Sequence, residues 1–270
     1  MPGEHGVAFV ASPIRTSRSQ GDPPLSRARG RARTLKARVS VALLALTVTA
    51  AATLLALQRP FAFYSPDVSF HAAKLLRASH GEIFRDPVTG TPSIYPPAFH
   101  VLFGSLNRLL RLDPPHLAVL IEVVDFVGLM VAAFFLARAV IGDSGEAAVC
   151  TLCLPLLFYS PTGRHVLLVS PSNFALVLQL AGFAVVCTAL RSGRDSVLAA
   201  GALLSGVAVN VVWYDAVPAV ALLSTVAVER VWRTRDPRRA LPLLAFLAPF
   251  VFTAVHLMAV REVCPPRASW

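Results

Sequence analysis

The stretch VSVALLALTVTAAATLLALQ, residues 39–58, decides the fold of this chain. It has 20 residues and no charge, and a helix of about 20 apolar residues crosses the hydrocarbon core of a bilayer. A basic segment, residues 1–38, precedes it with eight Lys/Arg and two acids. Secretory signal peptides are shorter, so we favour an uncleaved first span over a cleaved signal.

The composition of the whole chain points the same way. It is 55% hydrophobic and 15% charged, whereas soluble domains are nearer a quarter charged. The net charge of +10 comes largely from clusters beside apolar runs, which are topology signals first. Because no aromatic-basic interleaving accompanies the clusters, we expect an integral membrane protein that does not bind nucleic acid.

Further apolar runs cover residues 116–140, 147–160, 171–190, 196–213, 216–232 and 240–260. The positive-inside rule puts the tail, the 191–195 turn and the 230–239 turn in the cytoplasm. The amphipathic run 96–112 must then lie in the outer interface without crossing. We predict an all-α protein of the plasma membrane with seven spans, a cytoplasmic N-terminus and an extracytoplasmic C-terminus.

The predicted organisation has three parts. Residues 1–38 are expected to be a disordered cytoplasmic tail, 39–260 the transmembrane module, and 261–270 a short outer tail. The module includes a long first outer loop, residues 58–115, which holds one or two interfacial helices. Cys150 and Cys153 form a C-x-x-C motif inside an apolar run, and we interpret them as small buried thiols rather than a redox or zinc site.

The outer loop begins with SPDVSFHAAKLLRASHG, residues 65–81, which predicts a helix with Ser65 as N-cap and Gly81 at its C-terminal end. Asp67, His71 and Lys74 then share one helix face. A capping acid with an i,i+4 Asp–His pair explains this pattern, and so does a chemical site.

Other polar residues are expected on the same side of the membrane. Tyr95 and two prolines start the second loop helix, which carries His100 in its first turn. Glu122 and Asp125 share a face near the outer end of the span 116–140, where carboxylates usually face a cavity or a partner. Arg164 and His165 lie in the second outer loop, where Arg164 would suit a phosphate or a lipid headgroup.

The order of these features resembles the membrane-integral GT-C glycosyltransferases: protein mannosyltransferases, aminoarabinose transferases and oligosaccharyltransferase catalytic subunits. The resemblance covers about residues 39–260. It rests on the basic tail, the acid soon after the first span, IYPPAFHVLFGSLNRLL (residues 94–110), and the paired spans that include SPSNFALVLQLAGF (residues 170–183).

The resemblance implies transfer of a sugar from a polyprenyl-phosphate donor to a glycan, lipid or protein acceptor at the extracytoplasmic face. Asp67 matches the family's catalytic acid. The other implied substrate-binding residues are His71, Lys74, Tyr95, His100, Glu122, Asp125, Arg164 and His165. Some branches use a divalent metal held partly by an acidic motif in the second outer loop, where this chain has SPSN instead. We therefore expect no cofactor, with a divalent metal as the alternative.

Two other functions are consistent with the sequence. One is a non-catalytic or truncated relative that binds a lipid-linked sugar or a partner in the membrane. The other is a transporter in which Glu122 and Asp125 couple an ion, although no inverted repeat is evident.

Overall fold

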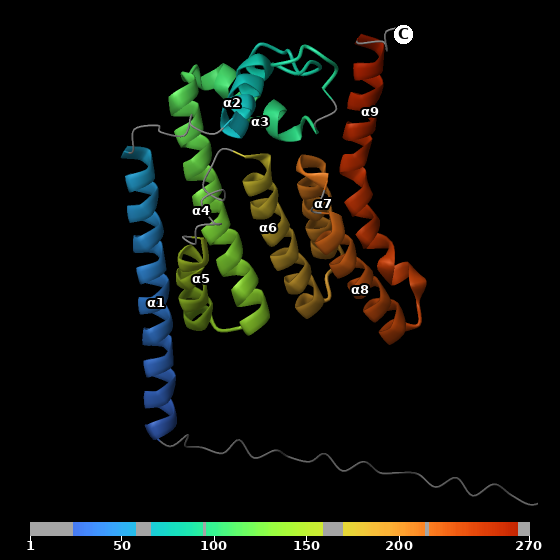
Figure 1. Ribbon diagram of the computed structural model, residues 1–270. Helices are drawn as coiled ribbons and strands as arrows, with labels where there is room; N and C mark the ends of the chain where they lie inside the picture. Colours follow the sequence, from blue (N-terminus) through green and yellow to red (C-terminus); the bar gives the residue numbers. More distant parts are fainter. Residues whose placement is uncertain (1–23, 58–65, 94–95, 159–169, 214–215, 264–270) are drawn as a thin grey trace, which may run out of the picture. The chain divides into compact units, whose positions relative to one another are not determined.

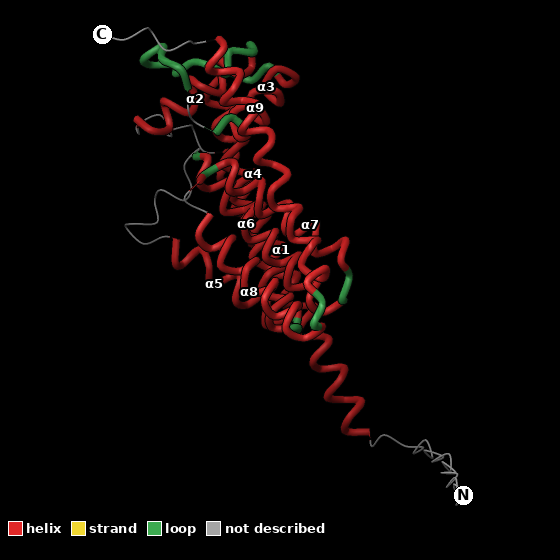
Figure 2. The backbone as a smooth tube through the Cα atoms, turned by 90° about the vertical axis from the view of Figure 1, so that its right-hand side faces the viewer, coloured by secondary structure: helices red, strands yellow, loops and turns green. Residues whose placement is uncertain are grey.

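The computed structural model of the chain describes residues 24–57, 66–93, 96–158, 170–213 and 216–263, with backbone alone at 24–33, 66–68, 155–158 and 263. The chain divides into two units, Met1–Lys36 and Ala37–Trp270, and packing is described within the second. The described residues form helices and connecting loops (Figure 1, Figure 2). The helices are α1 (Pro24–Leu57), α2 (Pro66–Ser79), α3 (Ala98–Leu110), α4 (Pro114–Ile141), α5 (Ser144–Phe158), α6 (Pro171–Ser192), α7 (Asp195–Val211), α8 (Ala216–Thr234), the 3-10 helix η4 (Pro237–Leu247) and α9 (Ala248–Val263).

This architecture confirms the all-helical fold of the described residues and contains helices that could cross a membrane. Within the described residues, four segments are long and apolar enough to cross a bilayer: Thr34–Leu57, Pro114–Ile141, Pro171–Ser192 and Pro237–Glu262. Two shorter apolar helices are Ser144–Leu154 and Asp195–Val211. The expected count of seven spans is not confirmed. For example, α8 was expected to be a span but is not among these four segments. Its last turns carry three charged residues, Glu229, Arg230 and Arg233.

The first helix differs from the expectation at its N-terminal end. We expected residues 1–38 to be disordered, but α1 begins at Pro24 and continues through the basic segment into the span. Leucine, alanine, arginine and lysine dominate residues 25–38, and all four favour helix. The helix that contains the first span therefore begins within the basic segment. Residues 1–23 lie outside the described part.

Both helices expected in the outer loop are present. α2 ends at Ser79, and Gly81 follows with φ of +87°, a left-handed conformation that suits glycine. α3 starts after Pro97, as the double proline predicts. Ser65, the expected N-cap of α2, lies outside the described residues. Similar residues begin and end α4: Asp113 is its N-cap, and Gly142 follows its last turn with φ of +88°.

Two buried clusters define the two ends of the second unit. One joins the loop helices α2 and α3 to the N-terminal parts of α4 and α6 and the end of α7; its residues include Leu75, Phe99, Phe103, Leu117, Ile121, Ala175 and Val211. The other joins the end of α6, the start of α7, α8 and η4 through Val186, Leu198, Leu223, Val226 and Leu243. The loop helices therefore cover the end of the bundle opposite the α6–α7 turn (Figure 1).

Glycines allow the later helices to approach closely. A Cβ on Gly182 would lie 2.6 Å from Ser205 Oγ across the α6–α7 interface, and one on Gly206 would lie 2.2 Å from the backbone oxygen of Phe246 in η4. Small residues bring helices together in membranes, where van der Waals packing drives association. The contacts of α7 with α6 and η4 thus depend on positions where any side chain would collide with a neighbour.

We predict that Gly206→Ala destabilises the protein by about 1–3 kcal/mol, because the added methyl would meet the η4 backbone, which cannot rotate away. Thermal unfolding in detergent should show a lower melting temperature. Gly128→Ala is the control, since its nearest obstacle is the Val177 side chain at 2.9 Å, which can move. A Gly206→Ala variant as stable as the control would contradict the close α7–η4 contact.

Candidate functional site

A buried polar cluster, which we call the cap cluster, lies among the loop helices. Its members are His71 and Lys74 of α2, Ser93 of the connecting loop and His100 of α3. Each is at most 4% exposed. Lysine is almost never buried to this degree without polar partners, so its position needs an explanation beyond packing.

The cap cluster is held together by side-chain contacts between segments. Lys74 Nζ donates to Ser93 Oγ at 2.5 Å, and His71 Nδ1 lies 3.0 Å from His100 Nε2. Phe99 packs edge-on against both imidazoles, with ring centroids 6.4 Å from His71 and 5.2 Å from His100. The apolar wall excludes water from one side, which strengthens polar interactions inside the site.

α9 adds a residue that the sequence analysis missed. His256 is 5% exposed, and its ring stacks on Phe84 of the loop between α2 and α3 with centroids 5.7 Å apart. Its Nε2 has no hydrogen-bond partner among the residues described. The available signal was a histidine inside an apolar run, which in a membrane protein marks a candidate functional residue. Ser93 carried no such signal, because an isolated serine in a turn-rich connector is ordinary.

Burial sets the electrostatics of the cap cluster. Desolvation lowers the pKa of Lys74 to about 8, against a smaller opposite effect of Asp86. Desolvation, followed by the nearby charges of Lys74 and His71, holds the pKa of His100 well below its usual range. Near neutral pH the cap cluster therefore combines a lysine cation with at least one neutral imidazole. Such a set of donors suits an anion with several oxygens, such as a phosphate.

The structure brings together only part of the predicted site. Of the predicted residues, His71, Lys74 and His100 form the cap cluster, and Asp67 belongs to the first turn of α2, four residues before His71. The Asp67 side chain lies outside the described part of the chain, as do Tyr95, Arg164 and His165. His100 is 1% exposed and packs inside the cap.

Glu122 and Asp125 follow on α4, below the apolar layer that includes Ile121. Asp125 is 5% exposed, and neither carboxylate oxygen has a hydrogen-bond partner among the described residues. Gln179 of α6, the helix packed against α4, is 4% exposed and equally unpartnered in that part of the chain. Unpaired polar groups in a bundle interior are costly, so Asp125 and Gln179 are two further positions that packing alone does not explain.

Metal and thiol chemistry find little support in the described residues. No group of three His, Cys, Asp or Glu side chains there is arranged to hold a metal ion. Cys150 and Cys153 are free and exposed, which corrects the expectation that both are buried. Their face of α5 points away from the helices it packs against, and in a membrane it would contact lipid.

In comparisons with known proteins, no protein family, no curated protein and no solved structure matches the chain.

The lowered pKa of Lys74 predicts a pH dependence of stability. Between about pH 8 and 10.5 the unfolded chain binds a proton that folded Lys74 has released. The free energy of unfolding should therefore rise with pH across this window. Unfolding in detergent at several pH values tests this. Lys74→Met should lose the rise, and Lys36→Met, which removes the chain's other lysine, should keep it. An identical profile for Lys74→Met would contradict the burial of Lys74.

We also predict opposite effects for two carboxylates of the α4 region. Asp125→Leu should raise the melting temperature, because it removes a buried group without partners, a change worth about 1–3 kcal/mol. Asp113→Ala should lower it by about 0.5–2 kcal/mol, because Asp113 accepts the His116 backbone N–H at 3.0 Å as N-cap of α4. Destabilisation by Asp125→Leu would mean that Asp125 has a partner in the native protein.

Proposed function

We propose that the protein is a membrane glycosyltransferase that moves a sugar from a polyprenyl-phosphate donor to an acceptor at the extracytoplasmic face. The observation that carries the proposal is the composition of α2. This helix places Asp67 on the same face as His71 and Lys74, which are buried in the cap cluster. Glycosyl transfer uses a carboxylate that accepts the acceptor proton and cations that stabilise the leaving phosphate.

The chemistry assigns one role to each part of the cap. Asp67 accepts the proton of the acceptor hydroxyl as its oxygen attacks the anomeric carbon of the donor sugar. The bond from that carbon to the phosphate oxygen breaks, and the polyprenyl phosphate leaves. Lys74 and the neighbouring imidazoles stabilise the charge on the departing phosphate. A bound phosphate would also favour the charged form of Lys74, offsetting its desolvation.

The distribution of charge supports the orientation. The cap lies at one end of the second unit, and the arginines of the 191–195 and 230–239 turns lie near the other cluster, at the opposite end. The positive-inside rule then assigns the arginine-rich end to the cytoplasm and the cap to the outer face. A lipid-linked donor would reach the cap from the outer leaflet of the plasma membrane.

A transporter is the second candidate, and the unpartnered Asp125 and Gln179 favour it. In that function a proton or cation would bind between α4 and α6, and uptake would depend on Asp125 and Glu122. A non-catalytic protein that binds a lipid-linked sugar would use the cap cluster without Asp67. Transfer and uptake measurements on the same variants separate the three functions.

We predict that Asp67→Asn lowers the rate of sugar transfer by at least 10²-fold, the usual contribution of a general base. The assay uses protein in lipid nanodiscs and radiolabelled polyprenyl-phosphate hexoses and pentoses, with a membrane extract as acceptor. Glu82→Gln is the matched control, because Glu82 is an exposed carboxylate of the same loop and is not a member of the cap cluster.

Lys74→Met should weaken donor binding as well as transfer, because it removes the cation that meets the phosphate. Full activity of Asp67→Asn would exclude Asp67 as the base. Absence of transfer by wild-type protein with every donor, together with retained donor binding, would favour the non-catalytic function.

A further inference from the structure

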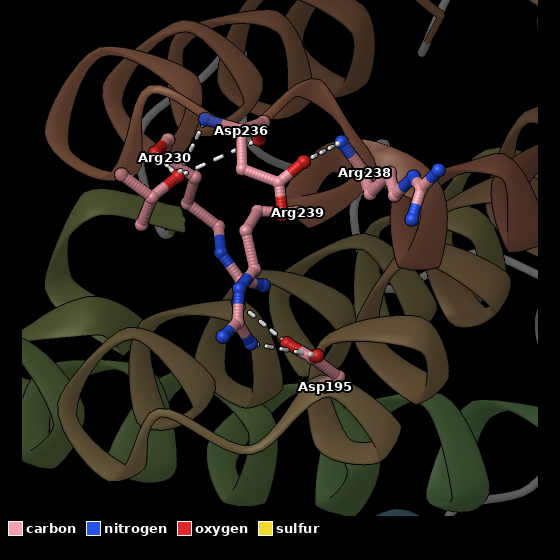
Figure 3. A network of polar contacts seen from close by, with 6 residues as sticks. Asp195, Arg230, Asp236, Arg238 and Arg239 are labelled. Atoms are coloured by element: carbon pink, nitrogen blue, oxygen red, sulfur yellow. Dashed lines mark hydrogen bonds and ion pairs between the residues drawn. The ribbon is translucent and has the colours of Figure 1, made fainter.

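The arginine-rich end of the bundle contains an ion-pair network around Asp195, the first residue of α7. Arg230 Nη2 of α8 donates to Asp195 Oδ1 at 2.5 Å, and Arg239 Nη1 of η4 lies 3.5 Å from Asp195 Oδ2 (Figure 3). One carboxylate thus ties α7 to the two segments that follow it. These two guanidiniums hold the pKa of Asp195 below its usual range, mainly through the Arg230 hydrogen bond.

The other two acids of this region are also engaged. Glu229 Oε1 pairs with Arg233 Nε at 2.8 Å. Asp236 Oδ1 accepts the backbone N–H of Arg238 at 3.0 Å, as N-cap of η4 (Figure 3). Each carboxylate between residues 229 and 239 is therefore already committed to a partner.

Two arginines remain without a carboxylate. Arg235 and Arg238 are exposed, and neither guanidinium makes an ion pair with any residue that the structure describes. The Asp236 carboxylate accepts the backbone N–H of Arg238 and does not pair with its guanidinium, so the Arg238 charge is not neutralised at short range. These two guanidiniums are available to an anion from outside the bundle.

An apolar groove of about 460 Å³ on α8 adjoins the first of these arginines. It is lined by Ala227, Val228, Val231, Trp232 and Arg235. Val228 and Trp232 are 67% and 68% exposed, and the Arg235 guanidinium lies over the Trp232 ring, 4.8 Å from its centroid. The groove therefore runs from a strip of aliphatic side chains to an aromatic ring and a cation.

We propose that this surface binds an anionic phospholipid. One acyl chain lies along Val228 and Val231, the glycerol region meets Trp232, and the phosphate is held by Arg235 and Arg238. Tryptophan favours this interfacial depth because its ring is amphipathic. A guanidinium matches phosphate oxygens in a bidentate fork, and its stacking on Trp232 fixes the orientation of that fork.

The charges select the kind of lipid. A zwitterionic headgroup contains a cation, which the two unpaired guanidiniums would repel. An anionic headgroup has no such cation. A soluble phosphate would make no use of the apolar groove. The surface is separate from the cap cluster, so the proposal does not depend on glycosyl transfer.

Tryptophan fluorescence provides a direct test. The chain has three tryptophans, and Trp213→Phe with Trp270→Phe leaves Trp232 as the single probe. The full-length protein is placed in nanodiscs of phosphatidylcholine that contain a few per cent of brominated phosphatidylglycerol or brominated phosphatidylcholine. Bromine quenches a neighbouring indole, so we expect the anionic lipid to quench Trp232 more strongly at equal mole fraction.

Substitutions identify the residues that give this preference. Arg235→Gln and Arg238→Gln should each weaken the preference for the anionic lipid about fivefold, the effect of one basic residue at a charged membrane surface. Arg235→Lys should retain most of the charge effect. Arg233→Gln is the matched control: it removes the same charge from the same helix end, but its guanidinium is paired with Glu229, so the preference should remain.

Four outcomes would overturn the proposal. The first two are equal quenching by the two brominated lipids and a preference unchanged by Arg235→Gln and Arg238→Gln together. The third is an equal loss in Arg233→Gln, which would mean that the whole basic end attracts anionic lipid without a defined site. The fourth is displacement of the lipid by soluble glycerol phosphate at low concentration, which would show that the groove contributes nothing.

Discussion

The absence of water from the bilayer core is the constraint on which the rest of this structure depends. Every backbone N–H and C=O there must be paired within the protein, and helices achieve this within one segment. Polar side chains follow the same rule: Thr151, Thr188 and Ser205 each donate to the carbonyl four residues earlier. Most strongly polar groups are instead placed at the two ends of the bundle, where the candidate sites lie.

The two ends meet different chemical demands. At the cap, Lys74 and His100 are buried under the loop helices, and burial lowers the pKa of both side chains. At the opposite end, Arg235, Arg238 and Arg239 are exposed, and the Asp195 carboxylate is shared between Arg230 and Arg239. A buried, tunable cation suits a reaction in which charge develops on a leaving group, whereas an exposed, permanent charge suits recognition of a lipid headgroup.

The candidate site could be predicted from the sequence only where residues share a helix. Asp67, His71 and Lys74 follow a period that any helix would place on one face. His100 was also flagged, but its contact with His71 depends on how α2 packs on α3. Ser93 and His256 could not be connected to Lys74 from spacing, since a loop and α9 bring them in. The buried state of Lys74 likewise required the packed cap.

The sequence by itself determined an all-helical chain with apolar segments, the two loop helices and the ends of several helices. Hydrophobic runs, capping residues and glycines act locally, so their effects can be deduced from neighbouring letters. The tertiary structure decided which helices lie together and which polar groups are buried. It also left Arg235 and Arg238 without carboxylates, because pairing depends on distances between segments that no sequence period specifies.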